Sequence, residues 1–165
     1  MSSKAQDTSA RSDYTVCVMN CHLTVAIVGT GFLARTRVHC WRRVHHADVK
    51  IIMVSRDKAR AEQFAKENGV LHFASLEEIL ADRGVDLVDL CVPNSVHADL
   101  CDLAATAGKH VLCTKPLTAF WGQGLPADAT AEQVAAVDRA AMLAAALADA
   151  DAMVASCKRA GVQLF

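Results

Sequence analysis

The stretch VAIVGTGFLA, residues 25–34, decides the fold. A short aliphatic run is followed at once by Gly29, Gly31 and Ala34 in G-x-G-x-x-A order. In such a turn the first glycine permits a sharp bend, the second lets the backbone approach a pyrophosphate, and the small third residue lets a helix pack closely on the strand. The N–H groups that begin the helix then face the phosphates. The stretch predicts a dinucleotide site over residues 29–34, formed also by Thr30, Phe32 and Leu33; a tight turn without a ligand is the alternative.

Outward from this turn, apolar runs alternate with helical stretches, which is the pattern of βαβ units and a parallel sheet. The expected strands lie at 24–29, 49–55, 70–73, 86–92, 110–114 and 162–165. The expected helices are Phe32–His45, Lys58–Asn68, Leu76–Asp82, Val96–Ala107 and Ala131–Ala160. The prediction is an α/β fold, a Rossmann-type doubly wound parallel sheet whose ligand crevice lies at the carboxyl ends of the strands.

The composition is that of one globular domain. The chain has 165 residues, of which 53% are hydrophobic and 21% charged, enough to bury a single sizeable core. We place the nucleotide-binding domain at residues 23–165 and expect residues 1–22 to be a disordered lead-in. The formal net charge of −1 gives no basic field for nucleic acid, so no nucleic-acid partner is expected.

Charge and cysteine content also bear on location. Aspartates interrupt the alanine-rich stretch 129–155, so no membrane-spanning run is expected. The seven cysteines include no CxxC pair, which fits a reduced, cytoplasmic protein. Cys17, Cys21 and His22 match no common zinc spacing, and no metal is expected.

The end of the second strand bears on the choice of cofactor. An acidic residue there favours NAD through the ribose 2′-hydroxyl, whereas an arginine accommodates the 2′-phosphate of NADP. Here Ser55 and Arg56 precede Asp57, which we expect to cap the next helix. Ser55 and Arg56 therefore predict a preference for NADP, with NAD possible; a solvated arginine at a strand end is the alternative.

The fourth strand ends in CVPNSVH, which brings four candidate residues to the crevice: Val92, Pro93, Asn94 and His97. We expect them to line the nicotinamide side. Asn94 as a helix N-cap and His97 as a surface histidine are equally open. The fifth strand ends in VLCTKP, which leaves Lys115 where a buried strand reaches solvent; a solvated loop lysine is its alternative.

In order and spacing, the glycine turn, CVPNSVH and VLCTKPL resemble the Gfo/Idh/MocA family of glucose-fructose oxidoreductase and inositol dehydrogenase. The resemblance covers residues 24–165, the nucleotide-binding half of the family. It implies that Lys115 is the catalytic residue beside the nicotinamide and that Pro116 shapes the turn that aims it. Thr114 stands where the family usually has glutamate. The resemblance also implies a C-terminal substrate domain, which is absent from this sequence.

The functional prediction is an NADP-preferring oxidoreductase that acts on a small-molecule sugar, inositol or related polyol, with a possible homo-oligomer in a full-length form. A non-catalytic NADP-binding regulatory module, or a truncated remnant, is the alternative.

The segment 118–131 is longer than the link usual in the family. Phe120 and Trp121 in it are expected to pack against a neighbour, and a lid over the crevice is the other reading.

Overall fold

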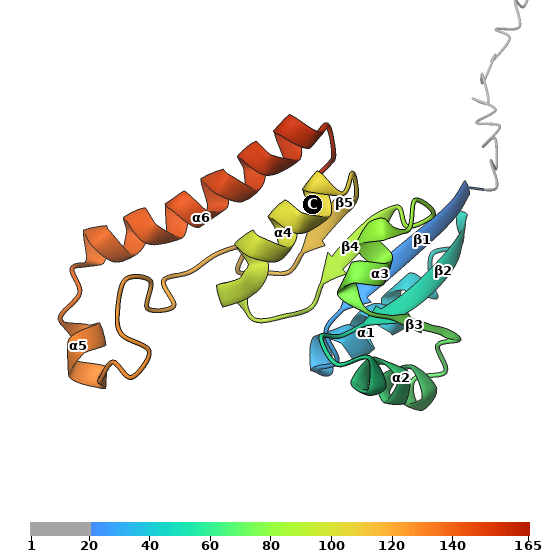
Figure 1. Ribbon diagram of the computed structural model, residues 1–165, viewed down its shortest axis with the longest axis horizontal. Helices are drawn as coiled ribbons and strands as arrows, with labels where there is room; N and C mark the ends of the chain where they lie inside the picture. The colour runs from blue at the N-terminus through green and yellow to red at the C-terminus, as the bar shows by residue number, and fades with distance from the viewer. Residues whose placement is uncertain (1–20) are drawn as a thin grey trace, which may run out of the picture.

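The computed structural model describes residues 21–165, and its centre is a five-stranded parallel sheet of order β3-β2-β1-β4-β5 (Figure 1). The strands are β1 (Cys21–Val28), β2 (Ala47–Val54), β3 (His72–Ala74), β4 (Leu87–Leu90) and β5 (His110–Cys113). Because β1 lies between β2 and β4, the chain winds outward from the middle in both directions. The predicted Rossmann-type doubly wound sheet is confirmed.

The segment predicted as a sixth strand adds only a short contact at the outer edge of β5. A parallel bridge joins Val111 to Leu164. The Val111 N–H donates to the Gln163 carbonyl at 2.9 Å, and the Phe165 N–H donates to the Val111 carbonyl at 2.8 Å. The segment therefore takes the expected place in the sheet order without forming a regular strand.

Strand β1 begins two residues before the expected domain boundary. Cys21 and His22 lie in the strand and pair with Ala47 and Asp48 of β2. The His22 side chain also lies 3.0 Å from the Asp48 carboxylate. The rest of the expected lead-in, residues 1–20, lies outside the described residues.

Helices cover both faces of the sheet. On one face lie α1 (Phe32–Trp41) and α2 (Lys58–Glu67); on the other lie α3 (Leu76–Ala81), α4 (His97–Thr106) and α6 (Arg139–Ala160). The short elements η1 (Asn94–Val96) and α5 (Ala131–Ala135) complete the list. Val25 and Ile27 of β1 pack toward α1, while Ala26 and Val28 pack toward α4. Both faces are buried, which explains why the strands are continuously apolar.

Side chains fix several helix boundaries. The Asp57 carboxylate accepts from the Ala59 N–H at 3.0 Å, as predicted. The predicted single helix over 131–160 is wrong, since it breaks between α5 and α6. There the Asp138 carboxylate accepts from the N–H groups of Ala140 and Ala141, so residue 138 is an N-cap and a new helix begins after it.

Helix α6 also corrects the expectation that no segment is apolar and long enough to cross a bilayer. It has 22 residues, and an 18-residue window within it has a mean hydropathy of 1.5, which satisfies the length and composition of a span. Alanines and leucines outweigh Asp149 and Asp151 in its sequence. One such helix is weak evidence for a membrane role; in the structure it packs on α4 through Met153 and Cys157, and 17% of that window is buried.

Candidate functional site

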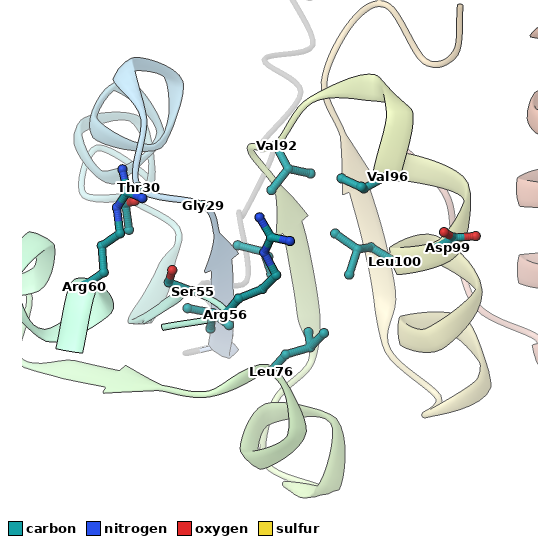
Figure 2. Close-up of a pocket in the computed structure, with 12 residues that line it drawn as sticks. Gly29, Thr30, Ser55, Arg56, Arg60, Leu76, Val92, Val96, Asp99 and Leu100 are labelled. Carbon is teal, nitrogen blue, oxygen red and sulfur yellow. The ribbon is translucent and has the colours of Figure 1, made fainter. Parts of the chain in front are cut away.

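A pocket of about 380 Å³ opens at the carboxyl ends of β1, β2 and β4, where the strand order reverses (Figure 2). Open parallel sheets bind their ligands at such a switch point. The pocket is lined by Val28, Gly29, Thr30, Val54, Ser55, Arg56, Arg60, Leu76, Val92, Val96, Asp99 and Leu100. Of the predicted site residues it therefore brings together Gly29, Thr30, Ser55, Arg56 and Val92.

Gly29 makes the sharp bend that the motif predicts. Its φ of +120° lies in the region that favours glycine, and its N–H donates to the Val54 carbonyl at 2.9 Å. A Cβ at this position would lie 2.3 Å from the carbonyl oxygen of Cys91. The close approach of the turn to the end of β4 therefore excludes any side chain at residue 29.

The reason for a glycine at residue 31 differs from the reason at residue 29. Its backbone is extended, and a Cβ placed on it would meet no protein atom within 4 Å. Neither backbone strain nor packing inside the protein therefore explains the glycine. The open space above Gly31 lies at the first turn of α1, where a ligand phosphate would need it.

The first turn of α1 has free N–H donors. Its N-cap is Gly31, no side chain caps it, and its first turn holds no acidic residue. By contrast, Asp57 and Ser75 cap α2 and α3. The unpaired donors and the positive end of the helix dipole make this turn suitable for an anion.

The other residues of the glycine motif lie outside the pocket. Ala34 is fully buried against the sheet, which confirms the predicted packing role of the small third residue. Leu33 packs against the same core, and Phe32 is 87% exposed.

Two arginines supply the charge of the pocket. In Figure 2 the Arg56 guanidinium projects across the hollow toward Val92, and Arg60 lies beside Thr30 on the other side of Ser55. Among the ion pairs of residues 21–165, none involves either arginine. Asp99 also lines the pocket but is ion-paired with neither arginine, so within the described residues the pocket presents two unpaired cationic groups, a suitable arrangement for a phosphate.

Arg60 was missed by the sequence analysis, although its position gave a signal. It lies four residues after Arg56, in the first turn of α2. A side chain at the start of a helix that follows a strand can reach back over that strand's end. The apolar wall of the pocket includes Leu76, Val96 and Leu100, which come from three further elements or their caps. Nothing in the sequence around these residues predicts that they line the pocket.

For the residues after β4, the structure contradicts the two alternatives to a place beside the nicotinamide. Asn94 opens η1 and is no helix N-cap, since Val96 takes that position at α4. His97 is not a surface histidine, because it is only 1% exposed. Nor is its ring free to bind a ligand in the crevice: Nδ1 lies 2.9 Å from the Leu117 carbonyl and Nε2 lies 3.0 Å from the Val92 carbonyl.

Lys115 lies just after β5, at the same edge of the sheet as the glycine turn. It is exposed and does not line the pocket. Thr114 is half-buried, Pro116 is exposed, and the Lys115–Pro116 peptide bond is cis. The structure therefore places Lys115 at the carboxyl edge of the sheet but outside the pocket.

The long segment after β5 docks on α6. The Thr118 hydroxyl donates to the Ala146 carbonyl at 2.7 Å, and the Gln123 amide donates to the Asp149 carboxylate at 2.9 Å. Trp121, which was expected to pack against a neighbour, is 51% exposed. Phe120 is half-buried.

A buried acid in the middle of β4 was also missed. Asp89 is fully buried on the face covered by α1, where the Trp41 indole N–H donates to it at 2.8 Å and the Arg37 Nε lies 3.4 Å away. Burial raises the pKa of the Asp89 carboxyl, while Trp41 and Arg37 oppose that rise. The cluster joins α1 to β4 on the face opposite the pocket.

With this geometry established, comparison with known proteins identifies the family. The model of the oxidoreductase family with an NAD-binding Rossmann fold, GFO_IDH_MocA, matches residues 23–141. The chain belongs to the Gfo/Idh/MocA family. The resemblance inferred from the three motifs is thereby confirmed.

Members of the Gfo/Idh/MocA family with named activities share parts of this sequence. D-apiose dehydrogenase of Paraburkholderia graminis is 29% identical over 141 residues, which cover 85% of this chain and 30% of that protein. D-xylose 1-dehydrogenase (NADP(+)) 2 of Haloferax volcanii is 48% identical over 68 residues, or 41% of this chain and 21% of that protein.

Among solved structures, an NAD-binding oxidoreductase from Klebsiella pneumoniae is 26% identical with a TM-score of 0.63. The match covers 87% of this chain and 33% of that one. The chain thus spans about a third or less of the length of these Gfo/Idh/MocA relatives.

Proposed function

We propose that this chain is the nucleotide-binding part of an NADP-preferring oxidoreductase that moves a hydride between nicotinamide and a hydroxyl-bearing carbon of a sugar, inositol or related polyol. The observation that carries the proposal is the pocket at the end of β2, where Ser55, Arg56 and Arg60 meet. The names of two relatives support the rest, since one is an NADP-dependent xylose dehydrogenase and the other an apiose dehydrogenase.

The residues present fit a dinucleotide. The free N–H groups of the first turn of α1 would bind the pyrophosphate, and the open space above Gly31 would admit it. Ser55, Arg56 and Arg60 would hold the 2′-phosphate, while Leu76, Val96 and Leu100 form an apolar wall for the adenosine. The nicotinamide, when bound, supplies the hydride chemistry.

Lys115 is the residue that we propose for proton transfer. Its amine would exchange a proton with the reacting hydroxyl or polarise it, which is the role of a general acid or base. The proposal is supported by its position after β5, at the edge shared with the glycine turn. Thr114 offers a hydroxyl where the family resemblance predicts a carboxylate, so any contact to the lysine from this position would be a neutral one.

One observation favours a second candidate function, an NADP-binding module without turnover. The pocket ends at Val92 and Val96 on the β4 side and does not reach Lys115. Cofactor binding and catalysis are therefore separate questions for this chain, and turnover assays on a full-length form distinguish the two candidates.

Titration calorimetry with NAD and NADP tests the preference for NADP. A charge-assisted contact to the 2′-phosphate is worth about 1.5–3 kcal/mol, or about ten- to a hundredfold in dissociation constant. Arg56→Ala and Arg60→Ala should each remove much of the NADP preference and leave NAD affinity nearly unchanged. The matched control is Arg83→Ala. Arg83 is an exposed arginine before β4, at the amino-terminal ends of the strands and therefore away from the pocket.

The ratio of the two affinities decides the outcome. Equal affinities of the parent chain for NAD and NADP would contradict the preference. A ratio that stays the same in both pocket variants would show that neither arginine contacts the 2′-phosphate. Increasing salt should narrow the gap between the cofactors, because the arginines lie at an open pocket.

A further inference from the structure

His97 is unusual among the polar side chains of the described residues. It is the first residue of α4, yet it is only 1% exposed, and the other buried polar or charged residues are Asp89, Lys109 and Ser156. A buried polar group needs hydrogen-bond partners, because an unpaired one is destabilising. The partners of His97 therefore indicate why a histidine is placed there.

Both ring nitrogens face backbone carbonyls. Nδ1 lies 2.9 Å from the carbonyl oxygen of Leu117, and Nε2 lies 3.0 Å from that of Val92. A carbonyl oxygen only accepts, so the ring must donate; a neutral ring donates to one of the two and a protonated ring to both. No nitrogen remains for a cofactor or substrate.

The two carbonyls belong to the two turns that lead out of β4 and β5. Val92 follows β4, lines the nucleotide pocket and precedes Pro93. Leu117 follows Lys115 and Pro116 and belongs to what we call the lysine loop, residues 114–118. His97 therefore connects the wall of the pocket to the loop that carries the lysine.

The lysine loop has few other attachments. Within the described part of the chain, Lys115, Pro116 and Leu117 make no hydrogen bond to another backbone group. Pro116 has no N–H to offer. The hydrogen bonds that hold residues 115–118 are the one from His97 to Leu117 and the one from the Thr118 hydroxyl to Ala146.

We propose that His97 is a positioning residue, which fixes the lysine loop against the Val92 turn and so sets where Lys115 lies relative to the nucleotide pocket. The significance for catalysis rests on the proposed function of Lys115. The structural part stands by itself: the histidine links two turns that no other described hydrogen bond links directly.

Backbone nitrogen-15 relaxation of the 165-residue chain tests the proposal, because it reports the mobility of the loop on the picosecond-to-nanosecond timescale. His97→Leu removes the hydrogen bonding of the ring, and the order parameters of Lys115, Leu117 and Thr118 should fall from about 0.85, the value of a rigid backbone, to about 0.6 or below. His97→Gln keeps an NH₂ donor and should give intermediate values. His72→Gln, an exposed histidine on β3, is the matched control and should change nothing in the loop.

Two further measurements keep the outcomes distinct. NADP affinity should fall by no more than about threefold in His97→Gln, because the phosphate-binding residues do not contact His97. A parent chain that fails to bind NADP would contradict the proposed function, but lower order parameters confined to the loop in the His97 variants would still support the positioning role. Unchanged loop order parameters in both His97 variants would overturn it.

If the His97 variants fail to fold, the parent chain still decides. Nitrogen-15 spectra of histidine-labelled protein should show at least one His97 ring N–H that exchanges slowly and couples to a backbone carbonyl. Thr118→Val removes the hydrogen bond from the loop to Ala146 and should lower the order parameters of the loop while that ring N–H persists. A His97 ring without a protected N–H would overturn the proposal.

Discussion

The two halves of the sheet's carboxyl edge are built differently. On the β1–β2 side, the glycine turn, the start of α1 and two arginines surround a hollow, and all of these groups lie within residues 29–60. On the β5 side, Lys115 stands exposed on a loop whose described anchors are side chains of α4 and of the loop itself. The nucleotide half is built from elements that follow one another in the sequence. The lysine half is a loop that side chains hold in place.

This difference indicates which property the chain holds by itself. Phosphate binding needs backbone donors and nearby cations, and consecutive βαβ elements supply both. Proton exchange with a substrate needs a second surface that holds the substrate against the lysine, and the nucleotide pocket does not include Lys115. Binding and turnover should therefore separate in experiments on this chain.

The largest expected effect is on turnover. We expect the 165-residue chain to bind NADP but to show no measurable dehydrogenase activity on inositol or aldoses, because positioning supplies about 7–11 kcal/mol of the barrier in well-oriented systems. Steady-state reduction of NADP by the purified chain checks this. Turnover above the no-enzyme rate would show that the lysine half is complete and would contradict the difference drawn between the two halves.

The next effect concerns the turn that builds the nucleotide half. Gly29→Ala should lower the free energy of unfolding by about 3 kcal/mol, because φ is +120° and the new Cβ would lie 2.3 Å from the Cys91 carbonyl oxygen. Urea unfolding followed by circular dichroism measures this change.

Gly31→Ala provides the matched counterpart. Its Cβ meets no protein atom, so stability should change by less than about 1 kcal/mol. Affinity for NADP should nevertheless fall by about tenfold or more, because the methyl group fills the space above the first turn of α1. If Gly31→Ala binds NADP as tightly as the parent does, the phosphate is not located there.

A smaller effect, on the pH dependence of stability, is expected from Asp89 in β4, the strand between the two halves. The folded state holds the Asp89 proton to a higher pH than the unfolded chain does, because burial raises the pKa of this carboxyl. The free energy of unfolding should therefore fall as pH rises from about 4, the ordinary aspartate pKa, through the raised pKa. Asp89→Asn should lack this slope, and urea unfolding between pH 4 and pH 8 compares the two. Parallel profiles would mean that Asp89 does not titrate in this way.

The smallest expected effect is that of Lys115→Ala on cofactor binding. Lys115 does not line the nucleotide pocket, so NADP affinity should change by less than about twofold in calorimetry. Lys58→Ala is a control for loss of one exposed amine. A large loss confined to Lys115→Ala would show that the two halves of the edge meet around the bound cofactor.

The parts that the sequence predicts are those determined by neighbouring residues. The bend at Gly29, the close packing of Ala34, the cap at Asp57 and the doubly wound order all depend on local patterns and confirm the predictions. The break at Asp138 also had a local signal, an aspartate before an alanine run, which alanine's helix preference obscured.

Other features depend on contacts between distant segments. The burial of His97 follows from carbonyls 5 and 20 residues away along the chain, and that of Asp89 from Trp41, which is 48 residues away. The apolar wall of the pocket likewise comes from several elements. No spacing rule in the sequence predicts such contacts, since they arise only when the sheet order brings the segments together.

The short contact of residues 163–165 with β5 has a consequence for self-association. A free sheet edge is a template for a strand of another molecule, and long flat edges promote aggregation. Here the N–H groups of Val111 and Cys113 are already paired with the carbonyls of Gln163 and Phe165, and β3, at the other edge, has only three residues. Neither edge of the five-stranded sheet therefore offers a long row of free backbone groups, which should limit edge-to-edge association of the purified domain.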